Sequence, residues 1–347
     1  MINDPVPPML DLAEGRRDER RRFLKLAGAS TAVAGGLALL SACGGGGSSP
    51  TPSPSPSPTP TPTPTNVATD ADFVNFALNL EYLEAQFYSI AVFGRALPES
   101  SLTGTVGTRG NVTGGRQVTF ADRATAAFVR EIAADKIAHV DLLRSVVTTS
   151  TTAAIAQPAI NIDGGTDGAF TNLMRQAGVI GASGTFDPYA SSDNFLLAAF
   201  ALEDVGVTAY KGLSPLIAAV ATLETAAGVL GSHAYHAATI RLALYMRGVD
   251  ALRTNALQIS DARDLLDGTP STGQGASKDL DQGITVSATD ASPNIVPADG
   301  NGIAFSRLPG QVLNVLYLRR DAGTSGGFFP AGINNRLDTL RSSAAST

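Results

Sequence analysis

Five side chains with metal-binding chemistry recur at matching places in two halves of the chain. His139 lies late in one apolar stretch, and the other two histidines, His233 and His236, lie late in another. An earlier stretch in each half carries a Leu-Glu pair, which ends in Glu81 or Glu203. Imidazole nitrogens and carboxylate oxygens together form a mixed ligand set that suits Zn, Fe(II) or Mn. If the stretches are helices of one core, these residues predict a metal site inside it.

A tyrosine follows each of these glutamates at the same distance. Tyr88 lies seven residues after Glu81, and Tyr210 lies seven residues after Glu203. Seven residues are about two helical turns, so each tyrosine shares a helix face with its glutamate. We expect both tyrosines to be core residues whose hydroxyls bond to the site carboxylates. The repeated spacing indicates a duplicated helix pair.

Hydrophobic periodicity predicts the long helices that carry these residues. Apolar side chains recur every three or four positions, and the expected helices cover residues 71–96, 120–147, 193–211 and 214–246. Ser214-Pro215 has the form of an N-cap followed by a first-turn proline, and the fourth helix, broken or continuous, runs from there. The connection over 148–192 is long and polar, with one short helix over 169–176. Two helical hairpins joined by one long crossover are typical of an all-α, ferritin-like four-helix bundle.

Several segments together resemble a known family. They are Leu80 to Tyr88, Glu131 to Asp135 with His139 to Asp141, Tyr235 to Ala238, Asn294 to Asp299, Ser306-Arg307 and Gly326 to Pro330. On these segments, over nearly all of residues 67–335, the chain resembles the ferritin-like domain shared by bacterial envelope proteins and plant desiccation-related proteins. In ferritin-like di-metal proteins, two helices each give a Glu and the other two each give a Glu-x-x-His motif. The resemblance therefore implies a metal centre inside the bundle.

Both Glu-x-x-His motifs are altered in this chain. The second helix has Lys136-x-x-His139, and the fourth has His233-x-x-His236. A pair of divalent ions brings about four positive charges into a dry core, which requires compensating anions. The two single glutamates supply two negative charges, and the lysine cancels one of them. We therefore expect at most one metal ion per chain.

The sequence leaves three arrangements of this core open. In the first, one Fe, Mn or Zn ion is held by Glu81, Glu203, His139, His233 and His236. In the second, the Lys136 ammonium takes the place of the metal and pairs with Glu81 and Glu203, so that the polar core is metal-free. In the third, Asp135 and His139, one helical turn apart, rotate into the site and restore a ligand. Glu84, one turn beyond Glu81, is expected in an accessory role.

The first 66 residues have the features of an export signal and a tether. Residues 1–43 combine a twin-arginine motif at Arg20 and Arg21 with an apolar stretch and a Leu-Ser-Ala-Cys sequence that ends at Cys43. That sequence resembles the lipobox of bacterial lipoproteins, which implies an acylated Cys43 as membrane anchor. Residues 44–66 are rich in Pro, Ser and Thr and cannot form helix or sheet. We expect export by the twin-arginine pathway to the periplasm or cell envelope.

Beyond the tether, composition separates a bundle over 67–248 from an extension over 249–347. The extension is rich in Asp, Gly and Ser, with one expected helix over 306–318, and we expect it to wrap one end of the bundle. The chain has a formal net charge of −6, and part of its basic charge lies in the signal, so a nucleic-acid partner is not expected. The sequence contains no nucleophile elbow and no phosphate-binding glycine loop.

Two classes of function fit these features. The first is an exported ferritin-like protein with a degenerate, at most mononuclear metal site, active in envelope stress or metal handling. The second is a non-catalytic structural or interaction lipoprotein whose site has lost its metals to Lys136. The altered ligands favour a protein that is not an enzyme, and any enzymatic activity is expected to be that of a metal-dependent oxidoreductase. The sequence identifies no protein partner.

Overall fold

The computed structural model describes residues 67–148, 153–268 and 280–344. Its four long helices are α2 (Asp70–Phe93), α3 (Arg123–Thr148), α5 (Ser192–Leu213) and α6 (Val220–Met246). The predicted all-α bundle is therefore confirmed. The predicted export signal, the anchor at Cys43 and the linker, all within residues 1–66, lie outside the described residues. Within the described part, none of the helices combines the length and the apolar character that a membrane span needs.

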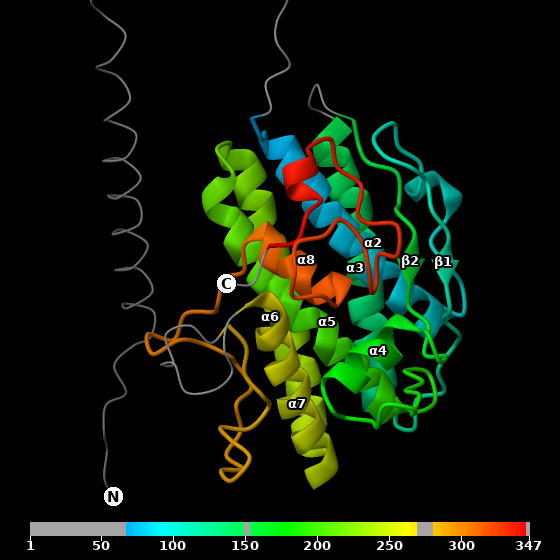
Figure 1. Cartoon of the computed structure of the whole chain (residues 1–347), viewed down its shortest axis with the longest axis vertical. Coiled ribbons are helices and arrows are strands. Elements are labelled where there is room, and N and C mark those ends of the chain that lie inside the picture. The colour runs from blue at the N-terminus through cyan, green and yellow to red at the C-terminus, as the bar shows by residue number, and fades with distance from the viewer. Residues whose placement is uncertain (1–66, 149–152, 269–279, 345–347) are drawn as a thin grey trace, which may run out of the picture. The chain divides into compact units, whose positions relative to one another are not determined.

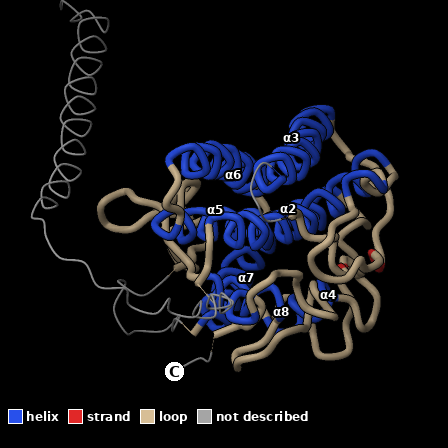
Figure 2. The backbone as a smooth tube through the Cα atoms, turned by 90° about the horizontal axis from the view of Figure 1, so that it is seen from above, coloured by secondary structure: helices blue, strands red, loops and turns tan. Residues whose placement is uncertain are grey.

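The helices form three layers. Figure 2 shows α2 and α5 side by side in the middle, with α3 and α6 on one side of them. The other side is covered by α4 (Ala169–Gln176), α7 (Asp250–Asp267) and α8 (Pro309–Tyr317). Because both sides of the middle layer are covered, α2 and α5 bury nearly all of their side chains. The chemistry-bearing residues of α2 and α5 therefore lie at the centre of the molecule.

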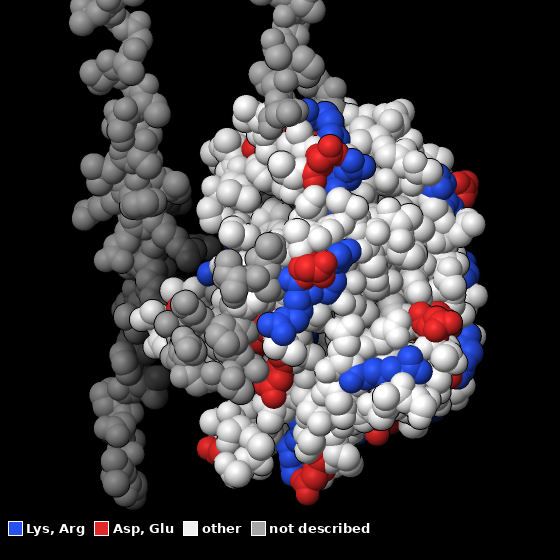
Figure 3. Space-filling model, in the orientation of Figure 1, with Lys and Arg blue, Asp and Glu red and all other residues white. Residues whose placement is uncertain are grey.

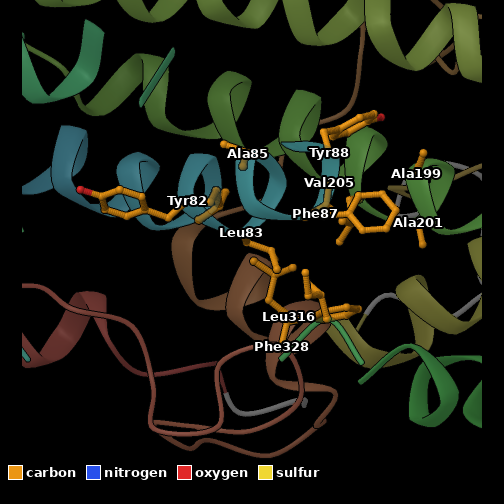
Figure 4. Close-up of a cluster of buried hydrophobic side chains, with 14 of the residues drawn as sticks. Tyr82, Leu83, Ala85, Phe87, Tyr88, Ala199, Ala201, Val205, Leu316 and Phe328 are labelled. Atoms are coloured by element: carbon orange, nitrogen blue, oxygen red, sulfur yellow. The ribbon is translucent and has the colours of Figure 1, made fainter. Parts of the chain in front are cut away.

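Aromatic packing joins the two middle helices to the covering layer. The ring of Phe87 on α2 stacks on Phe195 of α5 with centroids 5.0 Å apart and planes 9° apart. Phe170 of α4 lies 5.2 Å from Phe87 and 5.0 Å from Phe328 of the C-terminal extension. Figure 4 shows Leu316 and Phe328 facing this cluster from the extension. The extension thus completes the apolar core of the bundle.

The structure locates the end of α2 and the start of α6. Helix α2 ends at Gly94, whose φ of 68° gives a left-handed cap, several residues before Pro98. Of the two forms left open for the fourth helix, the broken one is observed, because Ser214–Leu216 is a separate 3₁₀ turn and α6 begins at Val220. The Asp70 carboxylate accepts hydrogen bonds from the backbone N–H groups of residues 218 and 219, at 2.9 and 2.7 Å. A side chain of α2 therefore supplies the acceptors at the beginning of α6.

The connections between the helices are mostly irregular. In the described residues, the 3₁₀ turns besides Ser214–Leu216 are Glu99–Ser101 and Asp338–Leu340, and a two-stranded parallel sheet pairs β1 (Val112–Thr113) with β2 (Ile160–Asn161). Figure 1 shows β1 and β2 beside each other at one edge of the bundle. On the face drawn in Figure 3, basic and acidic side chains lie next to one another in small groups, and most of that surface is uncharged.

The helix predicted over 306–318 is present as α8, but the extension holds a second helix, α7, that was not predicted. Four polar side chains of α7 are buried, namely Ser260, Arg263, Asp264 and Asp267. Arg263 donates to Asp204 of α5 at 3.0 Å and to Asp281 of the extension at 2.5 Å. Arg307 donates to Asp281 at 3.0 Å and to Asp267 at 2.6 Å. We call this group, together with Arg241 of α6, the arginine–aspartate network.

Candidate metal centre

The predicted site residues converge on one buried cluster between the two hairpins. Helix α2 contributes glutamates one turn apart, α5 contributes one glutamate, and α3 and α6 contribute the lysine and the histidines. The members are Glu81, Glu84, Lys136, His139, Glu203, His233 and His236, and none of them is more than 7% exposed. Two sets of residues could each hold a metal ion, because the ligand atoms within each set lie within 4.8 Å of one another. The first set is Glu81, His139 and His233; the second is Glu84, Glu203 and His233.

The Lys136 ammonium occupies the second of these sets. Its Nζ lies 2.6 Å from Glu84 Oε2 and 3.0 Å from Glu203 Oε2. The ring nitrogens of His233 lie 3.1 and 3.3 Å from the same Nζ. The sequence-based expectation that Lys136 pairs with Glu81 was wrong, because Glu84, one turn further along α2, takes that place. All three groups that could hold an ion here already contact a cation.

The first set is built around Glu81. Its Oε1 accepts a hydrogen bond of 2.6 Å from the Tyr210 hydroxyl and lies 2.8 Å from His233 Nε2. Its Oε2 lies 3.4 Å from His139 Nδ1, and apart from each other these two buried atoms have no partner among the described residues. A buried carboxylate oxygen beside a buried imidazole nitrogen, neither with any other partner, suits a cation between them.

His236 and Glu203 carry a further pair of such atoms. Glu203 Oε1 and His236 Nδ1 are buried and have no hydrogen-bond partner in the described part of the chain. His236 Nε2 lies 3.0 Å from Asp135 Oδ2, and the Asp135 side chain is 46% exposed. Asp135 therefore holds His236 from the surface and does not enter the cluster, so the third arrangement expected from the sequence is not observed. The unpartnered atoms belong to the residues predicted as ligands, and the cluster fits a metal ion on this ground.

The two tyrosines differ in their contacts. The Tyr210 hydroxyl donates to Glu81 as expected, whereas the Tyr88 hydroxyl interacts with Glu203 without a hydrogen bond of ordinary geometry. Burial raises the pKa of both hydroxyls well above the usual range, and the neighbouring carboxylates act in the same direction. Both phenols therefore keep their protons at neutral pH, and Tyr210 orients the Glu81 carboxylate.

The charges in the cluster do not balance. Burial raises the pKa of Glu84 well above its usual range, and the attraction of Lys136 does not offset this because the negative charges of Glu203 and Glu81 also raise it. Burial also acts on Glu81 and Glu203, but the facing cationic and imidazole groups outweigh it and lower both of these pKa values. Burial and the adjacent Lys136 lower the pKa of His233 to about 4, so its ring is neutral at pH 7. By formal charge, the three carboxylates of Glu81, Glu84 and Glu203 face one ammonium, and this excess of negative charge favours a cation at Glu81.

Gly206 of α5 is a site residue that sequence analysis missed. A Cβ at this position would lie 2.2 Å from His233 Nδ1 and 3.2 Å from Glu84 Oε1. The close approach of the α5 backbone is what leaves room for the His233 ring. A glycine in the middle of a helix lowers stability by roughly 0.5–1 kcal/mol relative to alanine. Its presence within a predicted buried helix is therefore the sequence signal that could have identified Gly206.

Replacing Gly206 by alanine is expected to displace His233 and to lower stability by about 1–3 kcal/mol, as overpacking does in a closed core. Urea unfolding and metal analysis of the loaded protein measure the two effects. Gly181→Ala is the control, because Gly181 is exposed and nothing lies within 4 Å of a Cβ built at that position. Equal stability and equal metal content in the two variants would contradict the role of Gly206.

Comparison with known proteins agrees with this geometry. The family model described as "Ferritin-like domain" matches residues 69–246. The chain is 27% identical over 280 residues to the ferritin-like catalase Nec2 of Nesocodon mauritianus, an alignment that covers 77% of this chain and 84% of that protein. It is 28% identical over 261 residues to the desiccation-related protein PCC13-62 of Craterostigma plantagineum, with 71% and 76% of the two chains covered. The chain belongs to the ferritin-like domain family.

Proposed function

We propose that this ferritin-like protein binds a single divalent metal ion, Fe, Mn or Zn, at Glu81 and His139. The observation that carries the proposal is the pair of unpartnered buried atoms, Glu81 Oε2 and His139 Nδ1, which lie 3.4 Å apart. Glu203 and His236 offer one more free ligand atom each. Carboxylate and imidazole donors together suit these three metals. When bound, Fe or Mn would supply a change of oxidation state, and Zn would supply a Lewis acid.

A single ion is proposed because Lys136 already fills the neighbouring set of ligand atoms. Its ammonium contacts Glu84 and Glu203 at 2.6 and 3.0 Å, where a second ion would need the same oxygens. Other residues hold the side chains around the proposed metal position at Glu81 and His139. Tyr210 fixes Glu81, and Asp135 fixes the His236 ring.

The proposal is tested by loading the purified protein anaerobically with Fe(II), Mn(II) or Zn(II) and measuring bound metal. We expect one ion per chain, and we expect Glu81→Gln to lose it, because the amide keeps the shape but removes the charge. Glu84→Gln is the matched control one turn away on the same helix, and it should retain the ion since its amide oxygen still accepts from Lys136. Two ions per chain, or equal retention in both variants, would refute the proposal.

A non-catalytic role without a metal is the second candidate. It is favoured by the ion pair of Lys136, which gives the core a cation of its own. Absence of bound metal after loading with each of the three ions would support this candidate. The similarity to a protein named a ferritin-like catalase makes hydrogen peroxide the first substrate to try on the loaded protein. Oxygen release in an oxygen electrode, lost in Glu81→Gln, would assign oxidoreductase activity to the site.

For the cellular location, we propose export by the twin-arginine signal and a lipid anchor on Cys43, in a role in envelope stress or metal handling. The motif at Arg20 and Arg21 and the sequence before Cys43 support this. The Cys43→Ser protein should leave the membrane fraction of the cell, and its continued presence there would argue against the anchor.

A further inference from the structure

Helix α6 exposes an apolar face on the outside of the bundle. Its large exposed members are Val220, Tyr235, Leu242, Met246 and, directly after the helix, Val249, with 80, 77, 47, 72 and 45% of their surface accessible. The last four follow one another at intervals of seven, four and three residues, which places them on one side of the helix. The opposite side of α6 carries His233 and His236. We call this outward surface the α6 face.

The remainder of the α6 face is small and nearly uncharged. Ala227, Gly228, Gly231 and Ala238 lie between the large side chains, and nothing lies within 4 Å of a Cβ built at either glycine. Glu224 is the one exposed charged residue of α6, since the helix's arginine, Arg241, is buried. An exposed helix of a monomer would normally carry charged residues on this side. The composition points to a surface that is covered in the working protein.

We propose that the α6 face binds the α6 face of a second copy of this chain, with the two helices antiparallel about a twofold axis at Tyr235. Such an axis brings residues equally far from Tyr235 into contact. Gly228 and Leu242 each lie seven residues from Tyr235, so the large side chain of one copy meets the open glycine of the other.

The size of the surface is sufficient for a stable dimer. Helix α6 has 27 residues and is therefore about 40 Å long. Together with the adjoining outer side of α3 the strip is about 20 Å wide, or about 800 Å² per partner, which is the usual size of a specific interface. The outer side of α3 exposes Arg123, Arg130, Glu131 and Asp141. An apolar centre with a polar rim is the usual composition of such an interface.

A membrane surface is a poorer occupant of the α6 face. Helices that lie on membranes carry Lys or Arg along the polar side to meet anionic lipids. The described residues of α6 offer only the buried Arg241, which donates to Asp204 at 2.7 Å. Arg247, at the end of the helix, already contacts Asp122 and Asp193 at 3.2 and 2.9 Å. The second copy therefore accounts for the surface better than a lipid layer does.

The association is tested by sedimentation of the full chain carrying Cys43→Ser, which removes the predicted anchor. We expect a dimer, and we expect Tyr235→Glu with Leu242→Glu to weaken it by about a hundredfold or more in dissociation constant. Val296→Glu with Ile303→Glu is the control, because these residues are also 69 and 51% exposed but lie on the extension. A monomer at every concentration, or equal weakening by both pairs of substitutions, would overturn the proposal.

The antiparallel pairing of the two α6 helices can be tested separately by cross-linking. In the Cys43→Ser chain, Tyr235→Cys should form a disulfide between two copies on mild oxidation, because the two positions meet at the axis. Val220→Cys should not, since its counterpart across the axis is at the other end of the helix. Cross-linking of both variants to the same extent would exclude the antiparallel arrangement. Binding of the parent Cys43→Ser protein to anionic phosphatidylserine vesicles, abolished by Tyr235→Glu, would assign the face to a membrane and overturn the proposal.

Discussion

Lys136→Glu is expected to raise the metal content from one ion per chain to two. The substitution removes the ammonium that contacts Glu84 and Glu203 and restores a carboxylate one turn before His139. Four carboxylates would then line the cluster, enough to offset two divalent ions. Metal analysis after anaerobic loading measures the result directly, and unchanged content would count against the arrangement of ligands proposed for this core.

The same substitution should make folding depend on metal. Without an ion, the Lys136→Glu core holds acidic groups and no ammonium, and removal of one partner from a buried ion pair costs about 3–5 kcal/mol. A metal ion that binds only the folded state stabilises that state increasingly as the free metal concentration rises above the dissociation constant. The melting temperature of the variant should therefore rise steeply with added Mn(II). Lys136→Met, which removes the cation without adding an acid, should show a smaller rise.

Asp204→Ala is expected to give the largest loss of stability without touching the metal ligands. Asp204 accepts hydrogen bonds from Arg241 at 2.7 Å and from Arg263 at 3.0 Å, and both guanidinium groups are buried. Removal of the carboxylate leaves the two buried guanidinium groups without one of their partners, which lowers the free energy of unfolding by about 3–5 kcal/mol. The free energy of unfolding in urea measures the effect.

The control for this prediction is Asp321→Ala. Asp321 pairs with Arg319, but its side chain is 75% exposed, so water screens the pair and replaces the lost contact. We expect no measurable change in the unfolding midpoint of that variant. If Asp204→Ala unfolded at the same urea concentration as Asp321→Ala, the arginine–aspartate network would not stabilise the fold.

The long helices were predictable because their apolar residues follow the helical period. The short α4 has the predicted bounds, 169–176, and the four bundle helices lie where the periodicity places them. Helix α7 escaped prediction because its buried face includes charged residues such as Arg263 and Asp267, so the segment lacks a continuous apolar stripe. Periodicity assumes that charged residues point to water, and it fails wherever arginines and aspartates neutralise one another inside the core.

The members of the site were predictable, but their pairing was not. Spacing along α2 and α3 indicates which side chains share a face, and these side chains do meet in the cluster. Whether Lys136 contacts Glu81 or Glu84 depends on side-chain rotamers and on Tyr210, which already bonds to Glu81. Asp135 likewise turned to His236 at the surface. Gly206 was missed because its role is to let the α5 backbone lie close to the His233 ring, and the spacing of residues along the sequence gives no sign of such a contact.

The placement of the cluster between covered layers has a kinetic consequence. Glu81 and Glu203 stand on helices that are covered on both sides, and the histidines on α3 and α6 close the remaining side with at most 7% exposure. Any ion must then enter or leave while α3 and α6 separate, a collective opening that takes microseconds or longer. Exchange with a strong chelator should be limited by the rate of that opening and so be independent of chelator concentration.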